Sequence, residues 1–310
     1  MQKKTICQMT DDSASIDGQQ GGTLGVPCRF KFTGSAMELF KELFVGYLLT
    51  IITLGIYTPW FICRAQRWFW RNVSVRDDAG KEVKLQFVGT GGDLFGTFIV
   101  GCILTVITFG IYGFWFIVKL HKFFLENTTG QTPDVQPVKL AFNATGGELF
   151  KELFVACLLT MITLGIYSPW MICSLQRFFS DKTKIHVGSS GQVSLRFLGT
   201  GGDLFLTFLV GYLLTCVTLG IYMFWFQVKI MKFISENTEI TTVSGNKLRL
   251  NFTGTGGENA KINIVGILLT ICTLGLYSFR FMIRLIEFQT NHLEITSAGP
   301  GTPGGTMVQP

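Results

Sequence analysis

The chain has little charge and few residues of the kinds that carry shared catalytic chemistry. Only 15% of its 310 residues are Asp, Glu, Lys or Arg, whereas 48% are hydrophobic. Its three histidines, His121, His186 and His292, do not recur at a common spacing. The sequence contains no HExxH motif, no nucleotide-binding loop and no Cys/His pattern with metal-ligand spacing. We therefore expect a protein that is not an enzyme and that holds no metal or cofactor.

Disulfide and export signals are also lacking. The cysteines form no CxxC pair, and we expect free, buried thiols at six positions in or beside apolar segments: Cys63, Cys102, Cys157, Cys173, Cys216 and Cys272. Residues 1–27 contain no apolar signal-peptide core, so the first apolar segment is expected to direct insertion. We expect residues 1–27 and 297–310 to be disordered tails. The net charge of +6 does not suggest nucleic-acid binding and fits loops near anionic lipid.

What the chain does have is a strict internal repeat. Gly-Ile-Tyr, or Gly-Leu-Tyr, recurs every 55 residues, at Gly55, Gly110, Gly165, Gly220 and Gly275, and a pair of threonines precedes each copy. A period of this size indicates one supersecondary unit copied along the chain. We divide the chain into five repeats: 28–82, 83–137, 138–192, 193–247 and 248–296. Repeat 5 has Arg280 where the others have Trp, and we expect it to be a divergent repeat that caps the array.

Each repeat begins with strand signals and continues with a long apolar segment. Residues such as Lys84-Leu-Gln-Phe-Val alternate polar with apolar, which is typical of a half-buried strand, and turn residues precede them. The apolar segment of repeat 1 runs from Glu38 to Tyr57, long enough as a helix to span about 30 Å of hydrocarbon. We therefore predict a mainly α-helical integral membrane protein of five repeats. Each repeat has a transmembrane helix and a second helix, either amphipathic or spanning, and extramembrane β-hairpins join the repeats.

The second helix of each repeat starts at an aromatic corner such as Pro59-Trp60 and carries a stripe of basic residues. Two interpretations remain open for this stripe. It could line an internal path, because charged residues inside a membrane are functional candidates, or it could extend to the lipid headgroups. The basic candidates are Arg64, Arg67, Lys119, Lys122, Arg177, Lys229, Lys232 and Arg284.

An acidic residue recurs at the N-terminus of each first helix. The favoured interpretation is helix capping, since a carboxylate there accepts backbone N–H bonds and opposes the positive end of the helix dipole. The alternative is a ring of carboxylates that attracts cations at a membrane face. The five acids are Glu38, Asp93, Glu148, Asp203 and Glu258.

The sequence leaves open whether a repeat crosses the membrane once or twice. The Gly-Ile-Tyr corners carry no Lys or Arg until Arg280, whereas the hairpins and second helices are basic. This charge pattern favours two crossings, with the corners periplasmic and the hairpins and termini cytoplasmic. Small residues at one repeat position are expected to form helix–helix contacts: Gly46, Gly101, Ala156, Gly211 and Gly266.

The combination Gly-Gly-Glu-Leu-Phe, Leu-Leu-Thr-x-x-Thr-Leu-Gly-Ile-Tyr, Pro-Trp and Arg-x-x-Arg-Phe/Trp-Phe resembles the YjgN-like family of bacterial inner-membrane proteins, a domain of unknown function. The resemblance covers residues 28 to about 296. It implies a multi-pass protein of the bacterial inner membrane and brings no known activity or binding residues.

We carry two hypotheses for function. The first is a transport or channel protein, because parallel repeats about one axis are a common plan for such proteins. The second is a non-catalytic scaffold or envelope protein that binds partners through its cytoplasmic hairpins. Membrane lipids are the expected partners in either case, with a homo-oligomer or an envelope protein as further candidates.

Overall fold

The computed structural model describes residues 28–76, 82–131, 137–189 and 191–297. Within these ranges every repeat folds in the same order: strand, helix, tight turn, helix, strand. The five predicted repeats are thus present, each with a pair of helices. The expected tails at 1–27 and 298–310 lie outside the described residues, and Ser297, assigned above to a tail, is the last residue of a strand.

The strands of all five repeats form one closed antiparallel sheet. Each strand that opens a repeat pairs with the strand that closes it, and each hairpin pairs one repeat with the next. The strands are β1 (Cys28–Phe32), β2 (Val73–Arg76), β3 (Glu82–Phe87), β4 (Thr128–Gln131), β5 (Pro137–Phe142), β6 (Thr183–Val187), β7 (Gly191–Phe197), β8 (Thr238–Thr241), β9 (Lys247–Phe252) and β10 (Leu293–Ser297).

Alternation along the strands gives the sheet one apolar and one polar face. In β7, Val193, Leu195 and Phe197 share one face, and Ser194 and Arg196 share the other. Apolar side chains from strands around the ring form one cluster that contains strand residues alone: Cys28, Val138, Val187, Val193, Ile240, Leu248 and Ile295. These side chains contact one another inside the closed sheet, and the polar face points outward.

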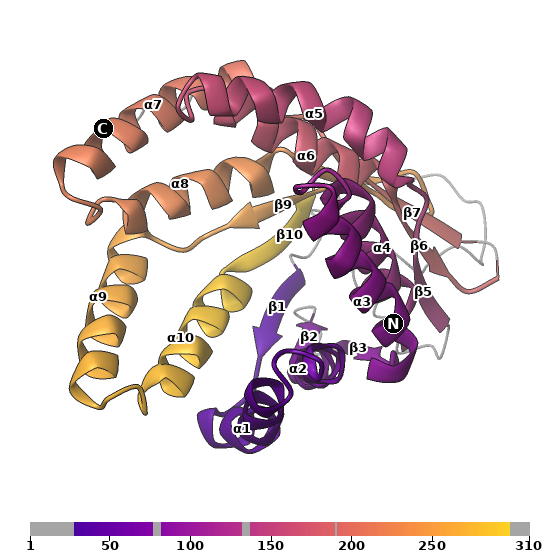
Figure 1. Ribbon diagram of the computed structural model, residues 1–310. Coiled ribbons are helices and arrows are strands. Elements are labelled where there is room, and N and C mark those ends of the chain that lie inside the picture. The colour runs from indigo at the N-terminus through magenta and orange to yellow at the C-terminus, as the bar shows by residue number, and fades with distance from the viewer. Residues whose placement is uncertain (1–27, 77–81, 132–136, 190, 298–310) are drawn as a thin grey trace, which may run out of the picture.

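The helices alternate between a longer first helix and a shorter second helix. The first helices have 17 residues each: α1 (Ala36–Ile52), α3 (Gly91–Ile107), α5 (Gly146–Ile162), α7 (Gly201–Val217) and α9 (Gly256–Cys272). The second helices are α2 (Thr58–Asn72), α4 (Gly113–Glu126), α6 (Ser168–Lys182), α8 (Met223–Glu236) and α10 (Ser278–Asn291). In Figure 1, α8 and α10 lie toward the middle of the molecule and α7 and α9 toward its periphery.

The apolar segment of repeat 1 is not one helix from Glu38 to Tyr57. It ends at Ile52, because Leu54 and Gly55 adopt positive φ angles of 50° and 93°, which an α-helix cannot contain. Among the described residues, no helix combines the length and the apolar character needed to cross a membrane.

Neighbouring repeats contact each other through a Trp and a Gly. Trp60 of α2 lies so close to Gly91 of α3 that a Cβ on Gly91 would stand 2.4 Å from the indole Cγ. The same contact joins Trp115 to Gly146, Trp170 to Gly201 and Trp225 to Gly256. In these four first helices the opening Gly therefore leaves room for the corner Trp of the preceding repeat.

Repeat 5 closes the ring onto repeat 1, which corrects the interpretation of repeat 5 as a cap. Strand β10 pairs with β1, the side chains of Arg29 and Glu294 form a 3.0 Å ion pair, and Phe279 packs edge-on against Phe40. The position of the corner Trp holds Arg280, and the position of the facing Gly holds Ala36. These two departures from the repeat belong to one interface, the one that joins the two ends of the chain.

Candidate functional site

The turn between the two helices exposes a large apolar side chain at the end of every repeat. These residues are 83% to 97% exposed and have φ angles of 49° to 51°: Leu54, Phe109, Leu164, Leu219 and Leu274. A left-handed backbone costs a residue with a Cβ about 1–2 kcal/mol, and Gly or Asn would avoid most of this cost. We call these five residues the tip residues. Their strain and exposure indicate that the side chains act outside the fold.

The paired threonines hold this turn together. In repeat 1 the hydroxyl of Thr50 donates to the carbonyl of Gly46 at 2.7 Å. The hydroxyl of Thr53 donates to the carbonyl of Leu49 and accepts from the backbone N–H of Tyr57 at 3.0 Å. The same bonds recur in the other four repeats.

Every backbone N–H from Thr53 to Thr58 donates to the chain's own atoms. The N–H of Gly55, for example, reaches the carbonyl of Thr50 at 2.8 Å. An exposed turn in water does not need such complete pairing, because water satisfies free N–H groups. In hydrocarbon each unsatisfied group costs several kcal/mol. The turn thus satisfies all of these N–H donors without water.

Exposed apolar side chains continue from the tips along the first helices. On α1 these include Val45, Leu48, Ile51 and Ile52, and α3, α5, α7 and α9 expose residues at the matching positions. Single exposed apolar residues are common on soluble proteins, but a contiguous apolar surface repeated around a ring marks a contact with another apolar phase or partner.

The prediction that small residues form helix–helix contacts is confirmed at the glycine positions. Gly46, Gly101, Gly211 and Gly266 each lie against the ring of a Phe on the second helix of the same repeat. Ala156, the fifth member of the set, is also buried.

Most of the basic candidates contact other parts of the chain. The guanidinium of Arg67 donates to the carbonyl of Gly89 at 3.1 Å, and Arg177 donates to the carbonyl of Gly199 at 2.8 Å. Both carbonyls belong to the link before the first helix of the next repeat. These two arginines therefore tie neighbouring repeats together.

Three of the four lysines of the stripe have local partners. The ammonium of Lys119 donates to the hydroxyl of Tyr112 and lies over its ring, and Lys229 lies over the ring of Tyr222. Lys122 pairs with Glu126 one turn later. For the remaining candidates, the described residues provide no ion pair to Arg64, Lys232 or Arg284.

The acids lie in the first turns of the first helices. Glu148 and Glu258 complete capping boxes, since each carboxylate accepts the backbone N–H of the preceding cap residue, Thr145 or Thr255. Asp93 and Asp203 accept from the hydroxyls of Thr90 and Thr200 at 2.6 Å, and the backbone N–H of Glu38 donates to the hydroxyl of Ser35. The carboxylates of Glu148 and Glu258 thus accept backbone N–H bonds as the capping interpretation predicts, whereas those of Asp93 and Asp203 accept from the cap hydroxyl.

The pKa of one acid follows from its cap. The backbone N–H of Thr145, and then the ammonium of Lys182 at 3.0 Å, lower the pKa of Glu148. The six cysteines predicted to be free are free. Burial was predicted for all six, but only Cys63 and Cys173 are buried, whereas Cys216 and Cys272 are exposed on the peripheral helices.

A buried polar network that the sequence pattern did not indicate lies between α8 and α9. The amide of Asn259 donates to the carbonyl of Phe224 at 2.7 Å and to the side chain of Gln227, and Asn263 donates to Asn259. Asn259 occupies a position at which the other repeats have a buried Leu. A polar residue at a repeat position that otherwise holds Leu is the sequence signal that could have indicated this network.

Comparison with known proteins agrees with the recurring unit. The family described as "Bacterial protein of unknown function (DUF898)" matches residues 27–79, 82–132, 137–189, 192–244 and 247–287, and the chain belongs to this family. The chain is 35% identical over 82 residues to "Inner membrane protein YjgN" of Salmonella typhimurium, which covers 26% of this chain and 20% of that protein. It is also 35% identical over 77 residues to the protein of that name from Escherichia coli K12, covering 25% and 17%. The matched segments are thus a small part of either relative. No solved structure matches the chain.

Proposed function

We propose that this DUF898 protein is embedded in the bacterial inner membrane through its five helical hairpins, and that its closed sheet forms a platform at one membrane face. The observation that carries the proposal is the turn at Leu54, where a fully exposed apolar side chain stands on a backbone whose N–H groups are all paired internally. The names of the two relatives, both inner membrane proteins, support it.

All five hairpins enter the membrane from the same side. The strands that precede and follow each helix pair are neighbours in one sheet, so every turn lies at the far end of its helices from the sheet. A first helix of 17 residues is about 25 Å long, most of the thickness of a hydrocarbon core. The turns carry no Lys or Arg, whereas the strands are basic, and this charge pattern supports a sheet on the cytoplasmic side.

A platform fits the inside of the ring better than a path through it. Cys28 and Val193 are fully buried within the apolar cluster on the inside of the closed sheet. Arg67, Arg177, Lys119 and Lys122 contact their own chain. A scaffold needs these contacts, whereas a conducting path would use free charges.

Transport remains the second candidate, because the five repeats surround a single axis. Flux measurements separate the two. Liposomes that contain the protein should be as impermeable to chloride, phosphate and potassium as empty liposomes. An anion flux that a Lys119→Gln/Lys229→Gln variant abolishes without loss of folding would establish transport instead.

Depth measurements test the embedding itself. Spin labels on single cysteines at Phe109, Leu219 and Gly245, in a cysteine-depleted chain in lipid nanodiscs, report contact with oxygen in lipid or with a nickel chelate in water. We expect the two tip labels to respond to oxygen and the hairpin label at Gly245 to respond to nickel. Equal access of nickel to all three labels would disprove the embedding.

A further inference from the structure

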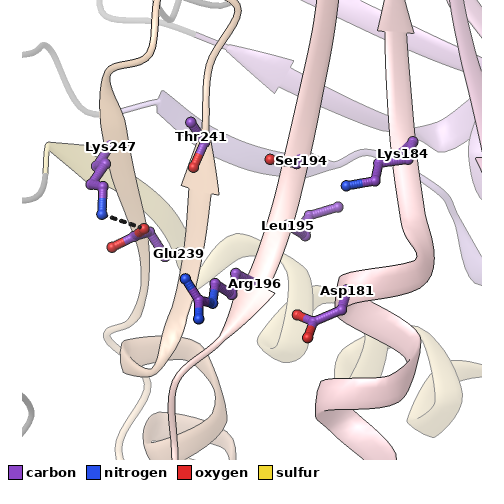
Figure 2. A pocket seen from close by; sticks show the side chains of 8 residues that line it. All are labelled: Asp181, Lys184, Ser194, Leu195, Arg196, Glu239, Thr241 and Lys247. Carbon is purple, nitrogen blue, oxygen red and sulfur yellow. Dashed lines mark ion pairs between the residues drawn. The ribbon is translucent and has the colours of Figure 1, made fainter.

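A cavity of about 280 Å³ lies on the polar, outward face of the sheet, across β6, β7, β8 and β9. Figure 2 shows its polar lining: side chains of Lys184, Ser194, Arg196, Glu239, Thr241 and Lys247, with Asp181 at the end of α6. The cavity is unrelated to the tip residues, and its function does not depend on how the helices meet the membrane.

The strand register arranges four of these residues in one row. Lys184 is the partner of Ser194, Ser194 of Thr241, and Thr241 of Lys247. Two hydroxyl groups thus form the floor of the cavity, with a lysine at each side. Hydroxyl and ammonium groups are donors that suit an anionic oxygen ligand.

Two of the cationic side chains around this row are not neutralised by an ion pair within the described part of the chain and can therefore contact an anionic ligand. Glu239, whose side chain is only 9% exposed, pairs with the ammonium of Lys247 at 3.0 Å. Among the described residues, Lys184 and Arg196 form no ion pair. A guanidinium matches the geometry of phosphate and carboxylate oxygens, so Arg196 can add a planar pair of donors above the hydroxyl floor.

The cavity exists where the repeat pattern is reversed. At the corresponding positions of β1, β3, β5 and β9 the other repeats have a long basic side chain, Arg29, Lys84, Lys139 or Arg249. The partner of that cation, on the strand that closes the preceding repeat, is Ser74 for Lys84 and Thr129 for Lys139. Only this pair is exchanged, with lysine at 184 and serine at 194. The exchange keeps the charge and opens a hollow on β7.

We propose that this cavity binds the phosphate group of a small phosphate ester. The hydroxyls of Ser194 and Thr241 donate to its oxygens, and Lys184 and Arg196 balance its charge. The carboxylate of Asp181 can accept a hydroxyl or amine of the same ligand. A free sugar or glycerol phosphate and the headgroup of a phospholipid share this chemistry.

The exchange itself gives the sharpest test. A Lys184→Ser/Ser194→Lys double variant restores the order of Ser74 and Lys84, keeps the net charge and fills the hollow. The purified full chain in detergent is titrated with glycerol 3-phosphate by calorimetry, and with mixed micelles containing phosphatidic acid or, as control, phosphatidylcholine. We expect the double variant to bind at least about tenfold more weakly, the loss that one or two charge-assisted hydrogen bonds produce.

Each outcome decides the proposal. Wild-type binding of glycerol 3-phosphate that the exchange abolishes supports the site with a soluble ligand, and binding of phosphatidic acid alone, again lost on exchange, supports a lipid headgroup. A Lys84→Gln variant at a distant pair should bind as the wild type does. If the exchanged chain misfolds by circular dichroism, Lys184→Gln replaces it. Absence of binding by the wild type, or equal binding by both chains, overturns the proposal.

Discussion

Gly101 lies directly against the ring of Phe116, so that a Cβ at position 101 would stand 2.2 Å from its Cδ2 atom. The same Gly–Phe contact occurs in three other repeats. Repeat 3 has Ala156 in place of the Gly and, at the facing position, Met171 in place of the Phe. A flexible thioether side chain can move away from a Cβ where a rigid ring cannot, so the chain contains its own compensated version of this contact.

We expect Gly101→Ala to lower the thermal midpoint in detergent. The added Cβ overpacks the contact, which should cost about 1–3 kcal/mol of folding free energy. Adding Phe116→Met should recover most of the loss, because it reproduces the pair in repeat 3. Gly96→Ala, in the same helix α3, is the control: nothing lies near its Cβ, and Ala is the better helix former. A double variant as unstable as the single one would show that the ring is not the obstacle.

The cap of α5 predicts a dependence of stability on pH. The backbone N–H of Thr145 and the ammonium of Lys182 lower the pKa of Glu148 below its ordinary value of 4.5. The cap therefore stabilises the fold above pH 4.5, and this contribution is lost as pH falls through the lower folded pKa. We expect Glu148→Gln to melt below the wild type at pH 7 and to approach it as the pH falls toward 3.

The control for this prediction removes the second partner alone. Lys182→Gln should keep part of the pH dependence, since the backbone bond from Thr145 is the larger cause. A Glu148→Gln chain whose deficit in thermal midpoint stays constant from pH 7 to pH 3 would contradict the capping role.

The polar network between α8 and α9 predicts opposite effects for one substitution and for three. Asn263→Leu removes the donor to the buried Asn259 and should cost about 1–3 kcal/mol. Replacing the whole network by Gln227→Ile, Asn259→Leu and Asn263→Leu should be near neutral or stabilising, because no unpaired polar group remains. Thermal midpoints of both chains decide it. A triple variant less stable than the single one would mean that the interface needs its polar groups.

The sequence predicted those parts of the fold that depend on local periodicity. The recurrence of Gly55 and its equivalents revealed five units, the alternation around Lys84 indicated strands, and the charge-free corners indicated that the units share one direction. The closure of the sheet into a ring could not be predicted from local periodicity. Pairing of β1 with β10 depends on the angle through which each repeat turns the sheet. Ala36 and Arg280 are the residues in the sequence that depart from the repeat because of this closure. Their departure can be explained only when the two ends of the chain are known to be adjacent.

Parts of the candidate sites could likewise be predicted from the sequence, and other parts could not. The corners were visible as motifs, but the break after Ile52 was not, because an apolar segment that contains Leu54 offers no sign of a left-handed backbone. The exchange of Lys184 and Ser194 was equally hidden, since two residues ten positions apart become neighbours only through the strand register. The contacts of Arg67 and Arg177 with the links of the next repeats likewise required the packing of the helices.

The strained tip residues predict a trade between stability and membrane binding. Asn tolerates the left-handed backbone, so replacing all five tip residues by Asn should relieve strain and leave the thermal midpoint in detergent equal or higher. The same change removes five apolar side chains, each worth about 1.5–3 kcal/mol on transfer from water to an apolar phase. Flotation with liposomes should therefore fall sharply.

The control is Val88→Thr/Leu198→Thr, which replaces exposed apolar residues beside the sheet with the Thr found at position 33 and should not change flotation. If the five-Asn chain floats as well as the wild type, the tips do not contact lipid. If it unfolds in detergent, the tip side chains serve the fold instead.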